Sequence, residues 1–285
     1  NQIQNDKMKE ESRRGTEKMK EENSKKTTPG RQAVLATLKN TQEIYFLFSG
    51  ATRMPFVYCD GDTFDDEVLV FFRQADARKE AERLTKEKYQ IQIAKLGSRQ
   101  YAPFFTSLYP LGVNQVVLDR GTEKETSLPL EDLVTRTPAE DLPKDRPRIE
   151  NPELHLTALY FMQELRRQPG QEMTAEMKEM QEEMMAHFSR GRFILAVQEG
   201  KGMPVLKQKD GTTFQPVFTD VAEFQKFNGK NGMKTAVVEA SKIPEALAPE
   251  AAGVVINPFG VNVQLKIQRK KKETWEKQEE QKEQQ

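Results

Sequence analysis

A break rich in proline divides the chain and limits what it can fold into. The stretch from Thr137 to Pro152 holds Pro138, Pro143, Pro147 and Pro152. Because proline lacks a backbone N–H and fixes φ, this stretch cannot continue a helix or a central strand. The chain of 285 residues also exceeds the usual size of one domain. The sequence therefore predicts two domains, at residues 31–136 and 152–268, with a linker at 137–151.

The two ends of the chain are predicted to lie outside both domains. Residues 1–30 and 269–285 consist mostly of Lys, Glu, Asn, Gln and Ser, so neither segment has an apolar face to bury. We expect a disordered or charged helical tail at each end. The second tail opens with the basic run 269–272, which is typical of membrane or nucleic-acid binding, but five glutamates follow it. We interpret this tail as solvated, and an adaptor that acts through the charged tails remains an alternative.

Charge and hydropathy favour a cytoplasmic protein that binds neither membrane nor nucleic acid. The 44 basic and 44 acidic residues cancel, so no global field attracts an anionic partner. No run of about 18 apolar residues occurs, and the first residues lack the pattern of a signal peptide. A segment that precedes Asn1 in a longer protein could still carry such a signal. The single cysteine, Cys59, cannot form an intramolecular disulfide and suits a reducing compartment.

Helical and strand patterns alternate in both halves, which predicts an α/β (α+β) fold with a mixed sheet in each module. In the first half we expect helices at 31–39 and 75–88 and strands at 44–48, 55–58, 68–72, 89–94 and 115–118. In the second half we expect strands at 192–197, 204–207, 214–218, 233–238 and 253–256, with an edge strand at 261–267. Helices are expected from Pro152, with Asn151 as N-cap, and at 173–188, 221–227 and 243–248.

One predicted helix carries a stripe of methionine. The stripe is Met173, Met177, Met180, Met184 and Phe188, at steps of four, three, four and four. This spacing puts all five side chains on one face of a helix, which predicts that Met177, Met180 and Met184 are buried. The alternative is a binding groove, because soft methionine side chains can pack against varied partners.

Four landmarks recur in the same order in the two halves. The pairs are Met54-Pro55-Phe56 with Met203-Pro204-Val205, Asp60-Gly61 with Asp210-Gly211, Val70-Phe71 with Val217-Phe218, and Val116-Val117-Leu118-Asp119 with Val254-Val255-Ile256-Asn257. The matching order of strand and turn types predicts a duplicated module. Strands 115–118 and 253–256 should then occupy equivalent places in their sheets.

The second copy resembles the SseB family N-terminal domain. The resemblance lies in the opening Asn151-Pro152-Glu153-Leu154, the junction Pro216-Val217-Phe218-Thr219-Asp220, and the ending Gly253-Val254-Val255-Ile256-Asn257-Pro258-Phe259-Gly260. The first copy departs from it, with Asp119-Arg120-Gly121 at the ending and Phe72-Arg73 at the junction. The resemblance implies a bacterial protein of a family without an established biochemical activity, so it implies no catalytic residues.

The candidate binding residues follow the strands of the second copy. They are Thr219, Asp220, Asn257 and Phe259. A polar turn at a strand end is where open α/β sheets bind ligands. The structural alternative is that Thr219 or Asp220 caps the next helix, Phe259 anchors the turn, and Gly260 takes a positive φ. If the turn recognises a partner, the second copy is the recognising module and the first is a scaffold.

No residue pattern predicts catalysis, a metal site or a cofactor. His155 and His187 have no cysteine nearby and no spacing typical of zinc, and neither has a candidate nucleophile in a known motif. Asp60 beside Cys59 should raise the pKa of the thiol. We therefore expect a non-catalytic interaction or regulatory protein with a protein partner, and we predict no oligomeric state. An enzyme that uses Asp or Glu as acid and base remains the alternative.

Overall fold

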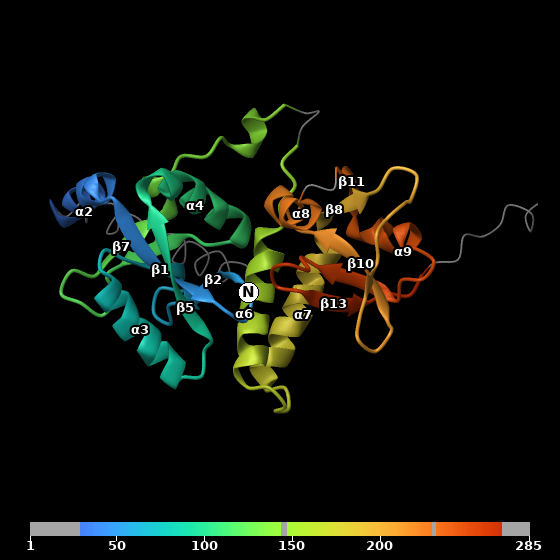
Figure 1. Cartoon of the computed structure of the whole chain (residues 1–285), viewed down its shortest axis with the longest axis horizontal. Helices are drawn as coiled ribbons and strands as arrows, with labels where there is room; N and C mark the ends of the chain where they lie inside the picture. The colour runs from blue at the N-terminus through green and yellow to red at the C-terminus, as the bar shows by residue number, and fades with distance from the viewer. Residues whose placement is uncertain (1–28, 144–146, 230–231, 270–285) are drawn as a thin grey trace, which may run out of the picture.

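The computed structural model describes residues 29–143, 147–229 and 232–269. The tail predicted at 1–30 lies outside the described residues except for its last two, which open a helix, and so does all of the tail at 269–285 except its first residue. Within the described part of the chain, two sheets stand on either side of a central helix pair (Figure 1). Each sheet is mixed and packs against helices, so the predicted α+β fold is confirmed.

The first sheet has the strand order β5-β1-β4-β6-β7, with β2 paired to β1 and β3 paired to β4. Its strands are β1 (Glu43–Ser49), β2 (Met54–Pro55), β3 (Val57–Cys59), β4 (Asp66–Phe71), β5 (Ile91–Gly97), β6 (Gln115–Leu118) and β7 (Thr126–Pro129). Its helices are α2 (Pro29–Asn40), α3 (Gln74–Lys86), α4 (Tyr101–Leu108) and α5 (Leu130–Leu133). Strands β4 and β6 are parallel, and the other pairs are antiparallel.

The second sheet has the order β11-β8-β10-β12-β13, with β9 paired to β10. Its strands are β8 (Arg192–Val197), β9 (Leu206–Lys207), β10 (Thr213–Phe218), β11 (Lys234–Glu239), β12 (Gly253–Ile256) and β13 (Val263–Lys266). Helices α8 (Val221–Asn228) and α9 (Ile243–Ala246) belong to this module. Strands β10 and β12 are parallel and the rest antiparallel, so both sheets have the same order and directions. Strands β6 and β12 hold equivalent places.

Single 3₁₀ turns complete the described elements. They lie at Ser98–Gln100, Tyr109–Leu111, Ala139–Asp141 and Ala240–Lys242. The turn at Ala139–Asp141 is the one regular element described within the predicted linker. Of the first-half elements, α4, α5 and β7 were not among the expected helices and strands. Elements α5 and β7 have only four residues each, too few to show a period. Helix α4 is short, but its buried residues Tyr101, Phe104, Phe105 and Leu108 do have helical spacing.

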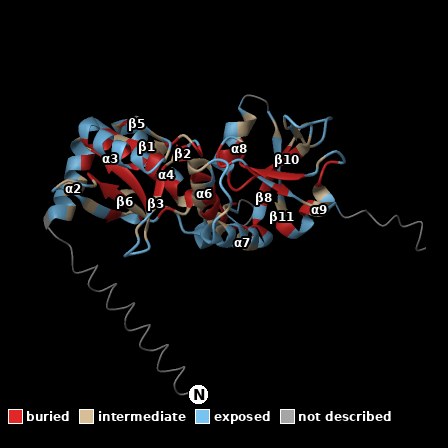
Figure 2. Ribbon diagram, turned by 90° about the horizontal axis from the view of Figure 1, so that it is seen from below, coloured by how far each residue is buried: buried red, intermediate tan, exposed pale blue. Residues whose placement is uncertain are grey.

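Helix α6 (Pro152–Arg167) runs between the two modules, and α7 (Ala175–Arg190) packs against it (Figure 1). Leu154, Ala158 and Phe161 of α6 belong to one apolar cluster that also contains residues of both sheets, such as Val68 and Val217. Figure 2 shows buried residues in both sheets and along α6, whereas much of α7 is exposed. The core is therefore continuous from one module to the other.

The methionine stripe is buried along only half of α7, which corrects the prediction for Met177 and Met180. Met184 is 1% exposed and Phe188 is buried, but Met177 and Met180 are half-buried. The C-terminal half of α7 packs against the second sheet, where the rings of Phe188 and Phe193 lie 4.9 Å apart, and against the turn at Ala240–Lys242. The N-terminal half lies beyond the sheet, against α6.

Candidate functional site

Three of the four predicted binding residues lie together at the end of the second sheet. Thr219 follows β10 and Asn257 follows β12, and the carboxyl ends of these parallel strands meet. Asn257 Nδ2 donates a hydrogen bond to Thr219 Oγ1 (2.7 Å), and the Thr219 N–H donates to Asn257 Oδ1 (3.0 Å). Asn257 has φ +46°, a left-handed conformation that Asn adopts more readily than most residues.

Asp220 completes this group and begins helix α8. Its Oδ1 accepts the backbone N–H of Glu223 (3.0 Å), so the predicted N-cap is confirmed for Asp220. Its Oδ2 accepts the Thr219 hydroxyl (2.8 Å).

His155 is a fourth member of the cluster, and the sequence analysis missed it. It comes from α6 and is 0% exposed. Its Nδ1 lies 3.2 Å from Thr219 Oγ1 and 3.4 Å from Asp220 Oδ2, and its Nε2 lies 3.5 Å from Asn257 Nδ2. A signal was present in the sequence, since a histidine next to the apolar face of a helix needs a buried polar partner.

The cluster of His155, Thr219, Asp220 and Asn257 holds the fold together and is closed to solvent. Burial opposes ionisation of Asp220, but the hydrogen bond and charge of His155 lower the pKa of this carboxyl below its ordinary value. In a nucleophilic triad the two imidazole nitrogens face different partners. Here the Thr219 hydroxyl and the Asp220 carboxylate both face Nδ1, and all four side chains are buried. The geometry therefore ties α6 to two strand ends.

Phe259 does not join this cluster. It is 47% exposed, and its ring lies 5.7 Å from that of Phe227 on α8. The positive φ expected at Gly260 occurs instead at Asn257 and Asn262. A Cβ at Gly260 would lie 2.7 Å from Glu223 Oε2, so a larger residue there would have to displace the end of this buried side chain.

The first module has the same turn with different chemistry. Asp119 follows β6 with φ +53°, and its Oδ1 accepts the backbone N–H of Phe72 (3.0 Å). Arg73, which stands where the second module has Asp220, gives helix α3 no side-chain cap. The turn geometry is therefore shared, but the buried histidine cluster belongs to the second module alone among the described residues.

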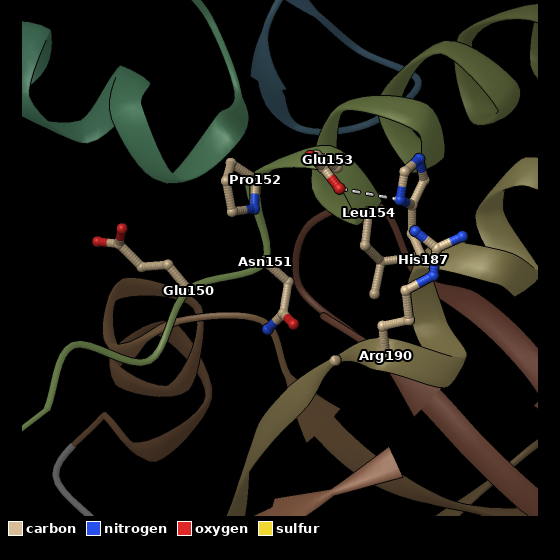
Figure 3. Close-up of a pocket in the computed structure, with 8 residues that line it drawn as sticks. Glu150, Asn151, Pro152, Glu153, Leu154, His187 and Arg190 are labelled. Atoms are coloured by element: carbon tan, nitrogen blue, oxygen red, sulfur yellow. Dashed lines mark ion pairs between the residues drawn. The ribbon is translucent and has the colours of Figure 1, made fainter. Parts of the chain in front are cut away.

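A shallow pocket of about 230 Å³ lies where α6 begins and α7 ends (Figure 3). His187 Nδ1 lies 3.1 Å from Glu153 Oε2, and His187 Nε2 lies 3.3 Å from Glu183 Oε1. Asn151 is the N-cap residue of α6, as predicted, and its carbonyl accepts the N–H of His155 (2.9 Å), but its side chain makes no capping hydrogen bond. Its Nδ2 donates to the carbonyls of Arg192 (2.7 Å) and Thr219 (2.9 Å), which fixes α6 to the second sheet.

A more polar cavity of about 590 Å³ opens on the first module, beside β4 and β6. Glu67 is 5% exposed there and accepts a hydrogen bond from Arg120 Nη1 (2.9 Å). Burial raises the pKa of Glu67 to about 7, although the charge of Arg120 opposes this rise. Burial also raises the pKa of the nearby Cys59 thiol, with Asp66 and Asp60 contributing as the sequence predicted for Asp60.

A third cavity, of about 380 Å³, is a groove at the end of the α6–α7 pair. Its apolar residues are Leu165, Met177 and Met180. Its polar lining is Glu164, Arg167, Gln168, Gln171, Glu172, Thr174 and Glu176. We call this feature the methionine groove.

Two kinds of site are absent from the described residues. No three His, Cys, Asp or Glu side chains lie together there in a way that could hold a metal ion. No helix in that part of the chain is both long and apolar enough to cross a membrane.

The chain is weakly similar to solved structures of Tic22. It covers 90% of Tic22 from Plasmodium falciparum with 78% of its own length, at 11% identity and a TM-score of 0.20. It covers 92% of Anabaena Tic22, described as a protein of protein transport, with 77% of its own length, at 11% identity and a TM-score of 0.19. Scores this low do not define a shared fold. No curated sequence gives a significant match.

The model of the SseB protein N-terminal domain matches residues 172–269. The match runs from the start of the α7 region to the end of β13, so it includes the cluster residues Thr219, Asp220 and Asn257 and the whole methionine stripe. Helix α6, with His155, precedes it. Over residues 172–269 the chain is therefore similar to the SseB protein N-terminal domain. The junction and the ending that carried the sequence resemblance lie within this match, and the opening at 151–154 precedes it.

Proposed function

We propose that this chain is a non-catalytic interaction protein that binds a partner protein in the methionine groove. The observation that carries the proposal is the half-burial of Met177 and Met180 beside Leu165, which is 37% exposed. Apolar side chains left partly uncovered in a concave surface gain free energy when a partner covers them. The second sheet covers Met184, and we propose that the partner covers Met177 and Met180 in the same way.

Methionine suits such a surface because its thioether is soft and its side chain is unbranched. It can pack against partners of different shape without large strain. The α6–α7 pair beneath the groove is fixed at its other end by Asn151 and His155, so the groove stands on a rigid support. We place recognition here and not at Asn257, because the side chain of Asn257 is fully buried and a partner cannot reach it.

We also propose that the two modules arose by duplication and that the first supports α6 from the side opposite the second sheet. The shared strand order and the equivalent turns at Asp119 and Asn257 support a duplication. A cytoplasmic location remains part of the proposal, supported by the single cysteine.

The test is to select binders from a displayed peptide library and to map them with ¹³C-methyl signals of methionine in the full chain. Binders should shift the signals of Met177 and Met180 and should lose affinity when Met180→Gln is introduced. Met185 is the matched control, since it lies on the same helix, is 43% exposed and does not line the groove. If the selected binders map to Phe259 or to the cavity beside Glu67, the proposed groove is wrong.

A further inference from the structure

A line of glutamates runs beside the methionine stripe at the same spacing. Each of four methionines follows a glutamate, in the pairs Glu172-Met173, Glu176-Met177, Glu179-Met180 and Glu183-Met184. Successive residues of an α-helix are about 100° apart, so within α7 the glutamates form one ridge along one flank of the stripe. All four glutamates are exposed. Glu172 precedes α7, and we call the three glutamates of the helix, Glu176, Glu179 and Glu183, the acidic ridge.

The other flank of the stripe carries no matching negative charge. The residues that follow the methionines of α7 there are Lys178, Gln181 and Met185. On the opposite wall of the groove, the Arg167 guanidinium pairs with Glu164 and lies 4.8 Å from the centre of the Tyr89 ring. The charge of Arg167 is thus already engaged, and the groove has an apolar floor with one negative edge.

These features identify the class of partner, and this inference rests on the proposed function of the groove. We propose that the methionine groove takes an amphipathic helix with lysine or arginine along one flank of its apolar face. Met177 and Met180, the α7 residues that line the groove, are three residues apart, which corresponds to about 4.5 Å along the helix axis, so a short occupant covers them. Its apolar residues cover Leu165, Met177 and Met180, and its basic flank faces the acidic ridge.

The experiment uses two synthetic helical peptides with the same apolar face, one with lysine and one with glutamate on the flank. Their binding to the full chain is measured by fluorescence anisotropy at low and at high salt. The lysine peptide should bind at least about ten-fold more tightly at low salt, and high salt should reduce this difference, because the ridge is exposed and its charges are screened.

Two variants locate the effect. The double variant Glu176→Gln with Glu179→Gln should weaken binding of the lysine peptide by about three- to ten-fold and should not weaken binding of the glutamate peptide. Glu182→Gln is the matched control, because Glu182 lies on the same helix but outside the ridge, and it should change neither affinity.

The outcomes separate this inference from the proposed function. If both peptides bind with equal affinity and Met180→Gln weakens the binding of both, the inference of a basic partner is wrong, but the groove is still a binding site. If neither peptide binds, or if Met180→Gln has no effect, both proposals fail. Self-association of the chain that Met180→Gln abolishes would assign the groove to a second copy and would also overturn the basic helix.

Discussion

At the scale of single residues, Asp119 and Asn257 hold equivalent turns in different surroundings. Each has a positive φ and accepts a backbone N–H from the neighbouring strand end. Asn257 also donates from its amide to Thr219, one residue from the carboxylate of Asp220. The amide is therefore needed in the second module. A carboxylate at this position would have no N–H to donate to Thr219 Oγ1 and would face the negative charge of Asp220.

This difference predicts unequal effects of two reciprocal substitutions. Asp119→Asn keeps the side-chain acceptor and should change the free energy of unfolding by less than about 1 kcal/mol. Asn257→Asp places a second buried carboxylate beside Asp220 and should cost about 2–4 kcal/mol at pH 7. Urea denaturation of both variants checks this, and equal losses would contradict the assigned role of the amide.

The raised pKa of Glu67 predicts how stability depends on pH. Its folded-state pKa of about 7 lies above the ordinary value of 4.5, so the folded protein holds this proton more tightly than the unfolded chain. The stability that results is fully present below about pH 4.5 and is lost as the pH rises through 7. Glu67→Gln removes this pH dependence. The free energy of unfolding of the variant, relative to that of the wild type, should therefore rise by about 3 kcal/mol between pH 4.5 and pH 8.

The measurement compares the two proteins by urea denaturation across this pH range. Only the change of the difference with pH is decisive, because replacing the protonated carboxyl by an amide adds a constant offset. A difference that stays flat would show that Glu67 titrates normally in the folded state.

At the scale of elements, the apolar patterns of the sequence predicted the positions of the strands well, but they did not predict how deeply each side chain is buried. The apolar runs at 192–197 and 214–218 agree with β8 and β10 within a residue. The spacing of the stripe gave the face of α7 correctly, but periodicity cannot tell where a covering sheet ends. The partners of His155 come from segments 64 and 102 residues away, and spacing along one chain does not reveal such contacts.

The uneven burial of the stripe predicts two different effects of one substitution. Met184→Glu places an unpaired charge in the core and should cost about 3–5 kcal/mol, with loss of soluble expression. Met180→Glu leaves the carboxylate at a groove open to water and should cost less than about 1 kcal/mol. The soluble yield of Met184→Glu and thermal melting of Met180→Glu check this, and a collapse of Met180→Glu would place the whole stripe in the core.

At the scale of the whole molecule, α6 makes the two modules one folding unit. Gln163 is buried and bonds to both backbone groups of Val57, accepting from the N–H (3.4 Å) and donating to the carbonyl (3.0 Å). It pairs with strand β3 much as a further strand would. Arg166 donates to the carbonyls of Ala51 and Val261, one from each module. Together with the continuous core, these bonds mean that neither sheet can lose α6 without exposing apolar surface.

The last prediction is that both sheets unfold together, which native-state hydrogen exchange can measure through slow amides of β4 and β10. Gln163→Leu leaves two polar groups of Val57 unpaired in the first module and should lower the free energy of unfolding by about 2–4 kcal/mol. The matched variant is Gln215→Leu, which removes the bond from the Ala248 N–H to Gln215 Oε1 (2.7 Å) inside the second module. Because the core is continuous, each variant should lower the protection of both sheets by the same amount. If Gln163→Leu affected β4 alone and Gln215→Leu affected β10 alone, the modules would be independent domains and α6 would merely lie between them.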